Sequence, residues 1–342
     1  MSLPTSKFFR LQSYYYELPD ELIAQEPCPN RDKARLLILD RAQGIIRHDT
    51  FNNIDNYLPV NSQIVLNNSK VIPARLLGHR SSGGVVEVFL LNPLEDGSSF
   101  EVLIKPLKKI REGEEIDFGS GISAILENKE KRIVRFNKKN IIRHLKEIGH
   151  IPLPPYIKRP DTDQDQEDYQ TVYAKEPGSV ASPTAGLHFT EDLIKKLEIQ
   201  GHQFSELTLH INYGTFKPVE CDDIRLHPMH TERYSIKPAV HKGILKSKKD
   251  SRPLVAVGTT SCRVLESVAH SGISAGSTNM FIFPGYKFQM VDVLITNFHL
   301  PHSTLLMLVS AFGGYDLVMK AYQEAIKERY RFYSYGDAML II

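Results

Sequence analysis

Residues 296–312 read TNFHLPHSTLLMLVSAF and place three kinds of local structure in direct succession. The run before them, residues 291–295, is apolar and β-branched, which is typical of a strand buried on both faces. Pro301 then breaks the pattern, because proline disfavours a helical conformation at the preceding residue. A helix capped by Ser303 or Thr304 follows. Its residues are apolar on every side, so we expect it to be buried, and it is shorter than the about 20 residues that cross a bilayer.

The loop between this strand and this helix carries Asn297, His299 and His302. Open α/β sheets bind ligands at the carboxyl ends of their strands, so the loop is a good place for chemistry. The alternative is that the two histidines only cap or pack, and the loop taken alone favours neither interpretation.

Composition sets broad bounds on the protein. The chain has 342 residues, 42% of them hydrophobic, which is enough for a substantial core and for two domains. The formal charge of +2 is small, so any contact with nucleic acid has to come from local basic patches. The three cysteines form no CxxC pair, which argues against a disulfide framework and a thiolate zinc site. Residues 1–20 lack a secretory signal, and we expect a cytoplasmic protein without a membrane segment.

A metal site is also not expected. Residues 227–233, HPMHTER, contain His227, His230 and Glu232, which are potential ligands. Their spacing matches no standard helical zinc motif, and thiolates are missing, so we predict no metal here.

The pattern of predicted secondary structure changes between about residue 70 and residue 135. Short strands follow one another at close spacing, separated by turns such as residues 119–121, Gly-Ser-Gly, and no long helical period intervenes. This pattern predicts a small antiparallel barrel or sandwich inserted into an α/β chain. The predicted domains are a discontinuous α/β domain, residues 1–67 and 151–342, and an inserted β domain, residues 68–150.

Two loops that precede helices have the composition of ligand loops. In residues 183–190, PTAGLHFT, Gly186 permits close backbone approach, and Thr190 can cap the following helix, whose N-terminus favours an anion. Residues 258–263, GTTSCR, combine backbone amides and three hydroxyls with Arg263, which can hold a carboxylate in a bidentate pair. Neither loop is a Walker or GxGxxG motif.

Four other segments carry structural expectations. Residues 254–257 should form a strand that ends at Gly258, with a helix opening near Ser261. In residues 206–211, ELTLHI, alternation places His210 on the polar face of a strand. Residues 161–168, DTDQDQED, should form an exposed acidic loop. The aromatic and apolar tail, residues 331–342, should dock as a last strand.

Taken together, seven segments resemble those of one known family, the S-adenosylmethionine:tRNA ribosyltransferase-isomerases of queuosine biosynthesis. In chain order the segments are LNNSKVIPARL, ASPTAGLHFT, MHTERY, VAVGTTSCRVLES, FIFPGYKF, TNFHLPHSTLLMLVSAF and RYRFYSYGDAMLI. The resemblance runs from about residue 16 to residue 342. Departures from the family pattern are few, at Asn68, Phe100, Asn212, Cys262 and Val264.

The resemblance implies a fold and an activity. It implies an α/β domain interrupted by a β-barrel domain. It also implies transfer and isomerisation of the ribosyl part of S-adenosylmethionine onto 7-aminomethyl-7-deazaguanine at the tRNA wobble position. Epoxyqueuosine, adenine and methionine are then the products. S-adenosylmethionine is consumed as the donor, so no bound cofactor is expected, and the protein is expected to be a monomer.

This reaction assigns roles to residues of the matching segments. The sulfonium acidifies the adjacent ribose carbon, so a base must remove a proton there, and a hydrogen-bond donor should assist adenine departure. We assign proton transfer to His188 and His299 and expect both to titrate near neutral pH, and the sequence does not decide which of them is the base. The expected substrate-binding residues are Thr184, Gly186, His210, Gly258, Thr259, Thr260, Ser261, Arg263 and Asn297. Gly258 to Ser261 and Arg263 are candidates for the methionine carboxylate.

Contacts with tRNA should come from cations. Arg75, Arg329 and Arg331 are the candidates for phosphate binding, together with the basic inserted domain. For the Lys- and Arg-rich residues 127–146, solvated surface charge is the other interpretation.

Two other classes of function share part of this pattern. A methyltransferase that uses the same donor would also need adenosine and carboxylate loops, but it normally shows a Gly-rich loop after its first strand, and residues 40–44 read DRAQG. A non-enzymatic RNA-binding module would use the basic β domain and leave the histidine loops without a purpose.

Overall fold

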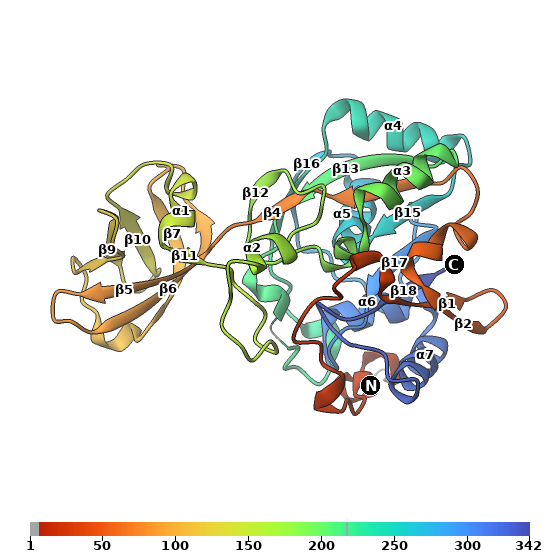
Figure 1. Ribbon diagram of the computed structural model, residues 1–342, viewed down its shortest axis with the longest axis horizontal. Helices are drawn as coiled ribbons and strands as arrows, with labels where there is room; N and C mark the ends of the chain where they lie inside the picture. The colour runs from red at the N-terminus through yellow and green to blue at the C-terminus, as the bar shows by residue number, and fades with distance from the viewer. Residues whose placement is uncertain (1–6, 217) are drawn as a thin grey trace, which may run out of the picture.

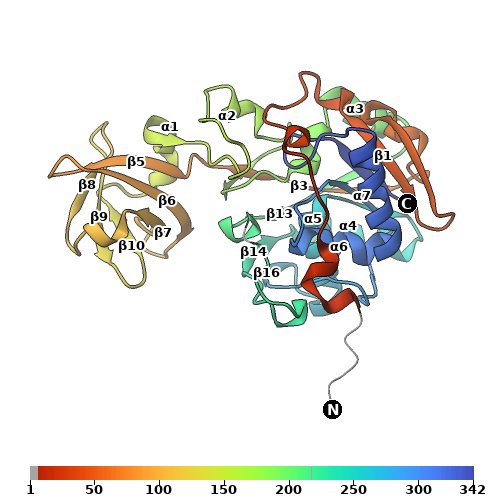
Figure 2. The ribbon, with the colours of Figure 1, turned by 90° about the horizontal axis from the view of Figure 1, so that it is seen from below.

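The computed structural model describes residues 7–216 and 218–342, without the side chain of Phe216. Figures 1 and 2 show a large α/β lobe and a smaller β lobe that stands apart from it. Residues 1–6 of the N-terminal stretch, where we expect no secretory signal, lie outside the described residues.

The large lobe is built on a nine-stranded mixed sheet with the order β16-β14-β13-β3-β15-β17-β18-β1-β2. Its strands are β1 Arg35–Asp40, β2 Ile45–Thr50, β3 Gln63–Asn67, β13 Gln203–Leu209, β14 Glu232–Ser235, β15 Leu254–Val257, β16 Ala275–Thr278, β17 Val293–Asn297 and β18 Ala338–Ile341. The four central strands β13, β3, β15 and β17 are parallel, so their carboxyl ends meet at one edge. The expected last strand is confirmed as β18, which pairs with β17 and β1.

Both faces of this sheet are covered, which explains why its strands are continuous apolar runs. In β1, Leu37 and Leu39 pack into the core with the helices α5, α6 and α7, whereas Leu36 and Ile38 pack on the other face with α3. The α-helices are α1 Leu145–Ile148, α2 Asp165–Asp168, α3 Glu191–Ile199, α4 Pro238–Lys249, α5 Gly258–Ser271, α6 Thr304–Gly313 and α7 Tyr315–Lys327. The 3-10 helices are η1 Lys7–Phe9, η2 Leu11–Tyr14, η3 Asp20–Leu22, η4 Arg31–Lys33, η5 Phe51–Asn56, η6 Leu107–Lys109, η7 Ile141–Arg143, η8 Thr184–His188, η9 Tyr213–Phe216 and η10 Ile224–Leu226.

The predicted helix starts are mostly confirmed by their caps. The Ser303 side chain accepts a hydrogen bond from the backbone N of Leu306 and caps α6. The Thr190 side chain accepts one from the backbone N of Leu193 and caps α3. The expected start of α5 near Ser261 is wrong, because the helix begins directly after β15 at Gly258, whose φ of +86° suits glycine.

The small lobe is a closed antiparallel barrel with a core of its own. Its strands are β5 Arg75–Arg80, β6 Val85–Pro93, β7 Ser99–Lys105, β8 Glu115–Asp117, β9 Ser123–Asn128, β10 Ile133–Phe136 and the short β11 Gly149–His150. Pairing between β5 and β8 closes the ring. Gly78 lies at this closure, where a Cβ atom would come within 2.7 Å of Ile116 and 2.8 Å of Phe118. The predicted fold class, an α/β domain with an inserted β-barrel, is confirmed, and the domain boundaries at 67/68 and 150/151 stay predictions.

Two segments connect the barrel to the large lobe. β4 Ser69–Val71 follows β3 directly and pairs in parallel with β12 Glu176–Ser179.

The acidic segment 161–168 precedes β12, and the expectation that all of it is exposed is wrong. Asp165 is 1% exposed, and its carboxylate accepts hydrogen bonds from Arg159 at 2.7 and 2.8 Å. A buried carboxylate needs such a partner, and the acidic pattern alone does not reveal one.

The buried helix α6 raises the question of a membrane span. Among the described residues, no single helix is long and apolar enough to cross a bilayer. α6 and α7 reach the required length only together, and they meet at a bend of 113°.

Candidate active site

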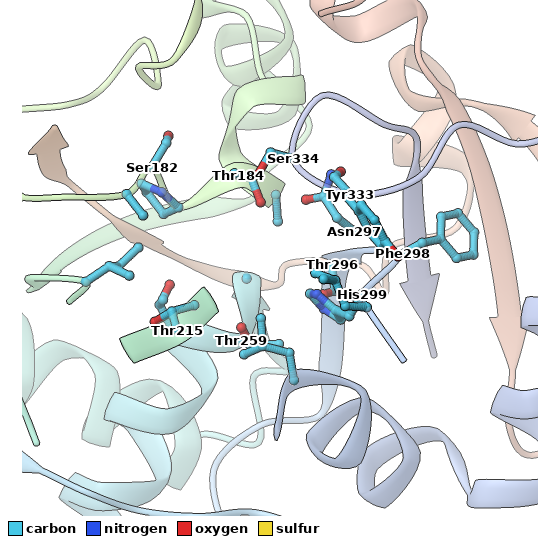
Figure 3. Close-up of a pocket in the computed structure, with 18 of the residues that line it drawn as sticks. Ser182, Thr184, Thr215, Thr259, Thr296, Asn297, Phe298, His299, Tyr333 and Ser334 are labelled. Carbon is cyan, nitrogen blue, oxygen red and sulfur yellow. The ribbon is translucent and has the colours of Figure 1, made fainter. Parts of the chain in front are cut away.

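A pocket opens at the edge of the sheet where β13, β15 and β17 end. It encloses about 700 Å³ of empty space, part of it open to solvent. Residues 333 and 334 close it from above β17, because β18 is antiparallel to β17 and therefore begins at the same edge. Figure 3 shows Asn297 and His299 on one side of this pocket, with Thr215 and Thr259 across from them. The predicted residues that line it are Thr184, Gly258, Thr259, Thr260, Arg263, Asn297 and His299.

Asn297 is the last residue of β17, and its amide is held in one orientation. The Nδ2 donates to the backbone O of Tyr333 at 3.1 Å and lies 3.3 Å from Nε2 of His188. Both partners use the amide nitrogen. The Oδ1 is buried without a partner, so this wall of the pocket presents a hydrogen-bond acceptor.

His299 lines the pocket two residues beyond Asn297. Its Nε2 lies 2.7 Å from the Thr296 Oγ1, and its backbone is fixed on both sides, since its N donates to the Tyr322 hydroxyl and its O accepts from the Tyr16 hydroxyl. Burial lowers the pKa of His299 to about 3 because the charged imidazolium is poorly solvated there. The side chain is therefore neutral at pH 7.

His188 does not line this pocket. It lies at the end of η8, behind Asn297, and borders a separate hollow with Arg31 and Cys28. Burial and then the positive charge of Arg331 lower the pKa of His188 to about 3, against a weaker opposing hydrogen bond with the backbone of Arg31. The expectation that His188 and His299 titrate near neutral pH is thus wrong for both. Loop position indicated exposure, but the tertiary packing buries each imidazole.

Several buried polar groups without a partner gather around the pocket. They are Tyr169 Oη, Ser182 Oγ, Thr260 Oγ1, Asn297 Oδ1 and the Nε and Nη1 of Arg263. Buried polar groups in folded proteins are nearly always hydrogen-bonded, so a set of unpaired ones on residues that line a single cavity indicates the site of a polar ligand. The groups come from segments far apart in sequence, and both donors and acceptors are represented.

Arg263 already has a carboxylate partner. Its Nη2 donates to Oε2 of Glu232, and both side chains are almost fully buried. The Glu232 Oε1 accepts from the backbone N of Asn212 at 3.1 Å and from Thr215 Oγ1 at 3.4 Å. The carboxylate that Arg263 holds in this structure is therefore one of the protein's own, although two nitrogens of the guanidinium have no partner.

Four residues that the sequence singled out lie away from the pocket lining. We expected Gly186 to permit the approach of a ligand. A Cβ at Gly186 would come within 2.0 Å of the Tyr173 hydroxyl, so this glycine instead permits close packing against Tyr173. Ser261 is buried inside α5. His210 follows β13 and packs against Gly178, with its pKa lowered by burial. His302 caps no helix, and its Nε2 is buried without a partner.

The three arginines expected at tRNA each lie beside an acidic group. Arg75 in β5 is 3.0 Å from Glu87 Oε2. Arg329 and Arg331 follow α7 and lie 3.8 Å from Glu21 and 3.8 Å from Asp337, respectively. The pairs of Arg75 and Arg329 are exposed, and such pairs are weak, so these two cations can still contact phosphate. Arg331 differs, because its partner Asp337 is buried.

The structure also adds pocket residues that sequence reasoning missed, chiefly Tyr156, Tyr169, Ser182, Tyr333 and Ser334. The rings of Tyr156 and Tyr333 have centroids 4.7 Å apart, and the Tyr156 hydroxyl lies 2.6 Å from Ser334 Oγ. Tyr333 has a φ of +70°, which is uncommon outside glycine and is concentrated at functional sites. The segment RYRFYSYGDAMLI, which carries part of the family resemblance, contains Tyr333 and Ser334 and was the available signal for these two residues.

Comparison with known proteins places the whole chain in one group. The family model described as "Queuosine biosynthesis protein" matches residues 11–341. A protein of Sulfurihydrogenibium sp. is 47% identical over 336 residues, which cover 97% of this chain and 100% of the relative. A protein of Carboxydothermus hydrogenoformans is 48% identical over 340 residues, with coverage of 97% and 100%. Both relatives are named S-adenosylmethionine:tRNA ribosyltransferase-isomerase.

A solved structure is similar along nearly the full length. The crystal structure of S-adenosylmethionine tRNA ribosyltransferase from Thermotoga maritima is 37% identical to this chain. The match covers 96% of this chain and 100% of that one, with a TM-score of 0.57.

Proposed function

The chain belongs to the queuosine biosynthesis protein family, and we propose that it is an S-adenosylmethionine:tRNA ribosyltransferase-isomerase. In this proposal it transfers and isomerises the ribosyl part of S-adenosylmethionine onto 7-aminomethyl-7-deazaguanine at the tRNA wobble position. The products are epoxyqueuosine in the tRNA, adenine and methionine. The donor is consumed, the methyl group stays on methionine, and the proposal includes no bound cofactor. The protein acts in the cytoplasm as a monomer.

One observation carries the assignment of this reaction to the pocket. Unpaired donors and acceptors on residues from four segments lie around a single cavity that is otherwise walled by apolar groups such as Ala181, Ile211 and Phe298. A nucleoside donor needs this combination, because its base and ribose present both apolar faces and many hydrogen-bonding groups. The Tyr156 and Tyr333 rings are suited to contact with a base.

The two histidines take different positions in the proposed mechanism. His299 lines the pocket as a neutral imidazole, so it has a lone pair to accept the proton that leaves the ribose carbon beside the sulfonium. His188 acts through Asn297, because its Nε2 accepts from the Asn297 amide and leaves Oδ1 turned to the pocket. We therefore assign His299 to proton transfer and His188 to positioning.

The tRNA side of the proposal rests on the basic residues. Arg75, Arg329 and Arg331 are assigned to phosphate contacts, together with the barrel. Single-stranded loops are recognised through splayed bases as well as backbone charge, which suits an anticodon loop.

The test is a two-label assay with purified protein and tRNA that carries the aminomethyl deazaguanine. S-adenosylmethionine labelled in the ribose should transfer its label to the tRNA nucleosides, with free adenine released. Donor labelled in the methyl group should leave the tRNA unlabelled. Methyl label in the tRNA would instead identify a methyltransferase, and the absence of both labels would remove the proposed activity.

A further inference from the structure

A side hollow adjoins the main pocket and shares three residues with it, Thr215, Arg263 and Leu305. It encloses about 370 Å³, part of it open to solvent, and its lining also includes Glu232 and Met229. The side hollow and the main pocket therefore adjoin each other at these residues, with the Arg263 side chain at the junction.

The junction holds two opposite charges in contact. Arg263 is 5% exposed and Glu232 is 4% exposed, and one hydrogen bond joins Nη2 to Oε2. The Glu232 Oε1 accepts from the chain around η9, through the backbone N of Asn212 and the hydroxyl of Thr215. Arg263 keeps N–H groups on Nε and Nη1 that have no partner. The pair is fixed by the fold, yet the arginine retains unused donors.

This arrangement is complementary to an α-amino acid group. Such a group carries an ammonium and a carboxylate on the same carbon, so its two charges lie side by side as those of Glu232 and Arg263 do. The carboxylate would accept from the free Arg263 donors, and the ammonium would donate to Glu232, as charge-assisted hydrogen bonds. The net charge of the pair and of the zwitterion is zero, so binding leaves no buried charge uncompensated.

We propose that the Arg263 and Glu232 pair binds the α-amino acid end of S-adenosylmethionine, with the adenosine in the main pocket. The methylene groups of that end lie along Leu305 and Met229, which line the side hollow. This inference rests on the proposed function, because it takes the same donor. It adds Glu232, for which the sequence analysis named no role in binding the donor, to the donor-binding residues.

The first test uses the unaltered protein and three probes in calorimetry: S-adenosylmethionine, S-adenosylhomocysteine and 5′-methylthioadenosine. S-adenosylhomocysteine and 5′-methylthioadenosine both have an uncharged sulfur. Of these two, S-adenosylhomocysteine carries the amino acid group and 5′-methylthioadenosine lacks it. We expect S-adenosylhomocysteine to bind at least about tenfold more tightly than 5′-methylthioadenosine, since charge-assisted hydrogen bonds are the strong ones. Equal affinities for these two probes would overturn the inference.

The second test compares Glu232→Gln with a matched control. Glu232→Gln keeps the shape but removes the charge, so the affinity ratio of S-adenosylhomocysteine to 5′-methylthioadenosine should fall toward one, with 5′-methylthioadenosine unaffected. Glu266→Gln is the control, because Glu266 is a fully buried carboxylate on α5 that accepts from the backbone N of Met290 and Val291 and lines neither hollow. Its variant should keep the wild-type ratio, even if its thermal stability falls.

The outcomes separate this inference from the proposed function. If Glu232→Gln weakens both probes equally, the pair only maintains the shape of the site, and the inference is wrong. If the unaltered protein transfers ribose label but does not distinguish the two probes, the proposed function stands and the inference fails. If none of the three probes binds, both are overturned.

Discussion

The Nδ2 atom of Asn297 lies 3.3 Å from the Nε2 atom of His188, and the asparagine separates this histidine from the main pocket. The contact joins two of the segments that the sequence marked for chemistry, although their residues are far apart in the chain. The contact also fixes the orientation of the amide. Its Nδ2 is hydrogen-bonded to His188 and Tyr333, so the Oδ1 is the atom without a partner.

The orientation of this amide can be tested with Asn297→Asp. The aspartate places a second oxygen where Nδ2 donates, so it opposes the acceptor on His188 and loses the bond to the Tyr333 carbonyl. An unsatisfied buried group costs about 1–3 kcal/mol, so kcat/KM should fall by about fivefold to 150-fold. The negative charge should also raise the pKa of His188, which NMR titration of the imidazole would detect. An unchanged kcat/KM would exclude a role for the amide.

The two histidines should differ in what they do to turnover. His299→Ala removes the group at the pocket wall and should lower kcat by about 100-fold to 10,000-fold while S-adenosylmethionine still binds. His188→Ala should also suppress turnover with donor binding kept, and His188→Gln, which restores an acceptor for Asn297, should recover part of it. Single-turnover kinetics and calorimetry measure the two effects. Full activity of His188→Ala would remove this residue from the mechanism.

Burial of two neutral imidazoles makes the stability depend on pH. The pKa of His188 and of His299 is about 3 in the folded protein, against about 6.5 in an unfolded chain. The unfolded state therefore binds more protons below pH 6.5, and the free energy of unfolding falls as the pH falls from 6.5 toward 3. The slope contributed by each histidine approaches about 1.4 kcal/mol per pH unit. Urea unfolding between pH 7.5 and 5 should show this fall in the free energy of unfolding. The fall should be smaller in His299→Gln, because that variant has one buried imidazole fewer. A pH-independent midpoint in this range would contradict it.

Binding of tRNA should weaken steeply with salt. If Arg75, Arg329 and Arg331 each neutralise a phosphate, each of them makes the slope of log affinity against log salt concentration more negative by about 0.7 to 0.9. Arg329→Ala should lower the steepness by this amount, and Lys196→Ala on α3, which pairs with Asp55, should leave it unchanged. Filter binding over a salt series measures both. Identical slopes for the wild-type protein and Arg329→Ala would remove that contact.

Gly186 should tolerate no side chain. A Cβ there would come within 2.0 Å of the Tyr173 hydroxyl and 2.8 Å of Thr171, so Gly186→Ala forces the packing apart and should destabilise the protein by about 1–3 kcal/mol. Gly243→Ala is the control, because this residue lies within α4 with nothing within 4 Å, and alanine favours a helix by about 0.8–1.0 kcal/mol. Thermal unfolding should move in opposite directions for the two variants.

Local sequence features predicted the elements on which the site is built. β17, the capped helix α6 and the barrel strands follow from residue periodicity and cap chemistry, which act over a few neighbouring residues. The resemblance of seven segments pointed to the family that the comparisons then showed. Arg263 and Asn297 were found in this way because Asn297 ends strand β17 and Arg263 lies in the first turns of the helix that follows β15.

The sequence by itself thus determined the fold class, the family and the loops that border the pocket. Only the tertiary structure decided which side chains share it, because those relationships join residues that are distant in the chain. It paired Arg263 with Glu232, placed His188 behind Asn297, and lowered the pKa of both histidines by burying them. Burial and long-range pairing depend on how separate elements pack, and no local pattern of residues specifies them.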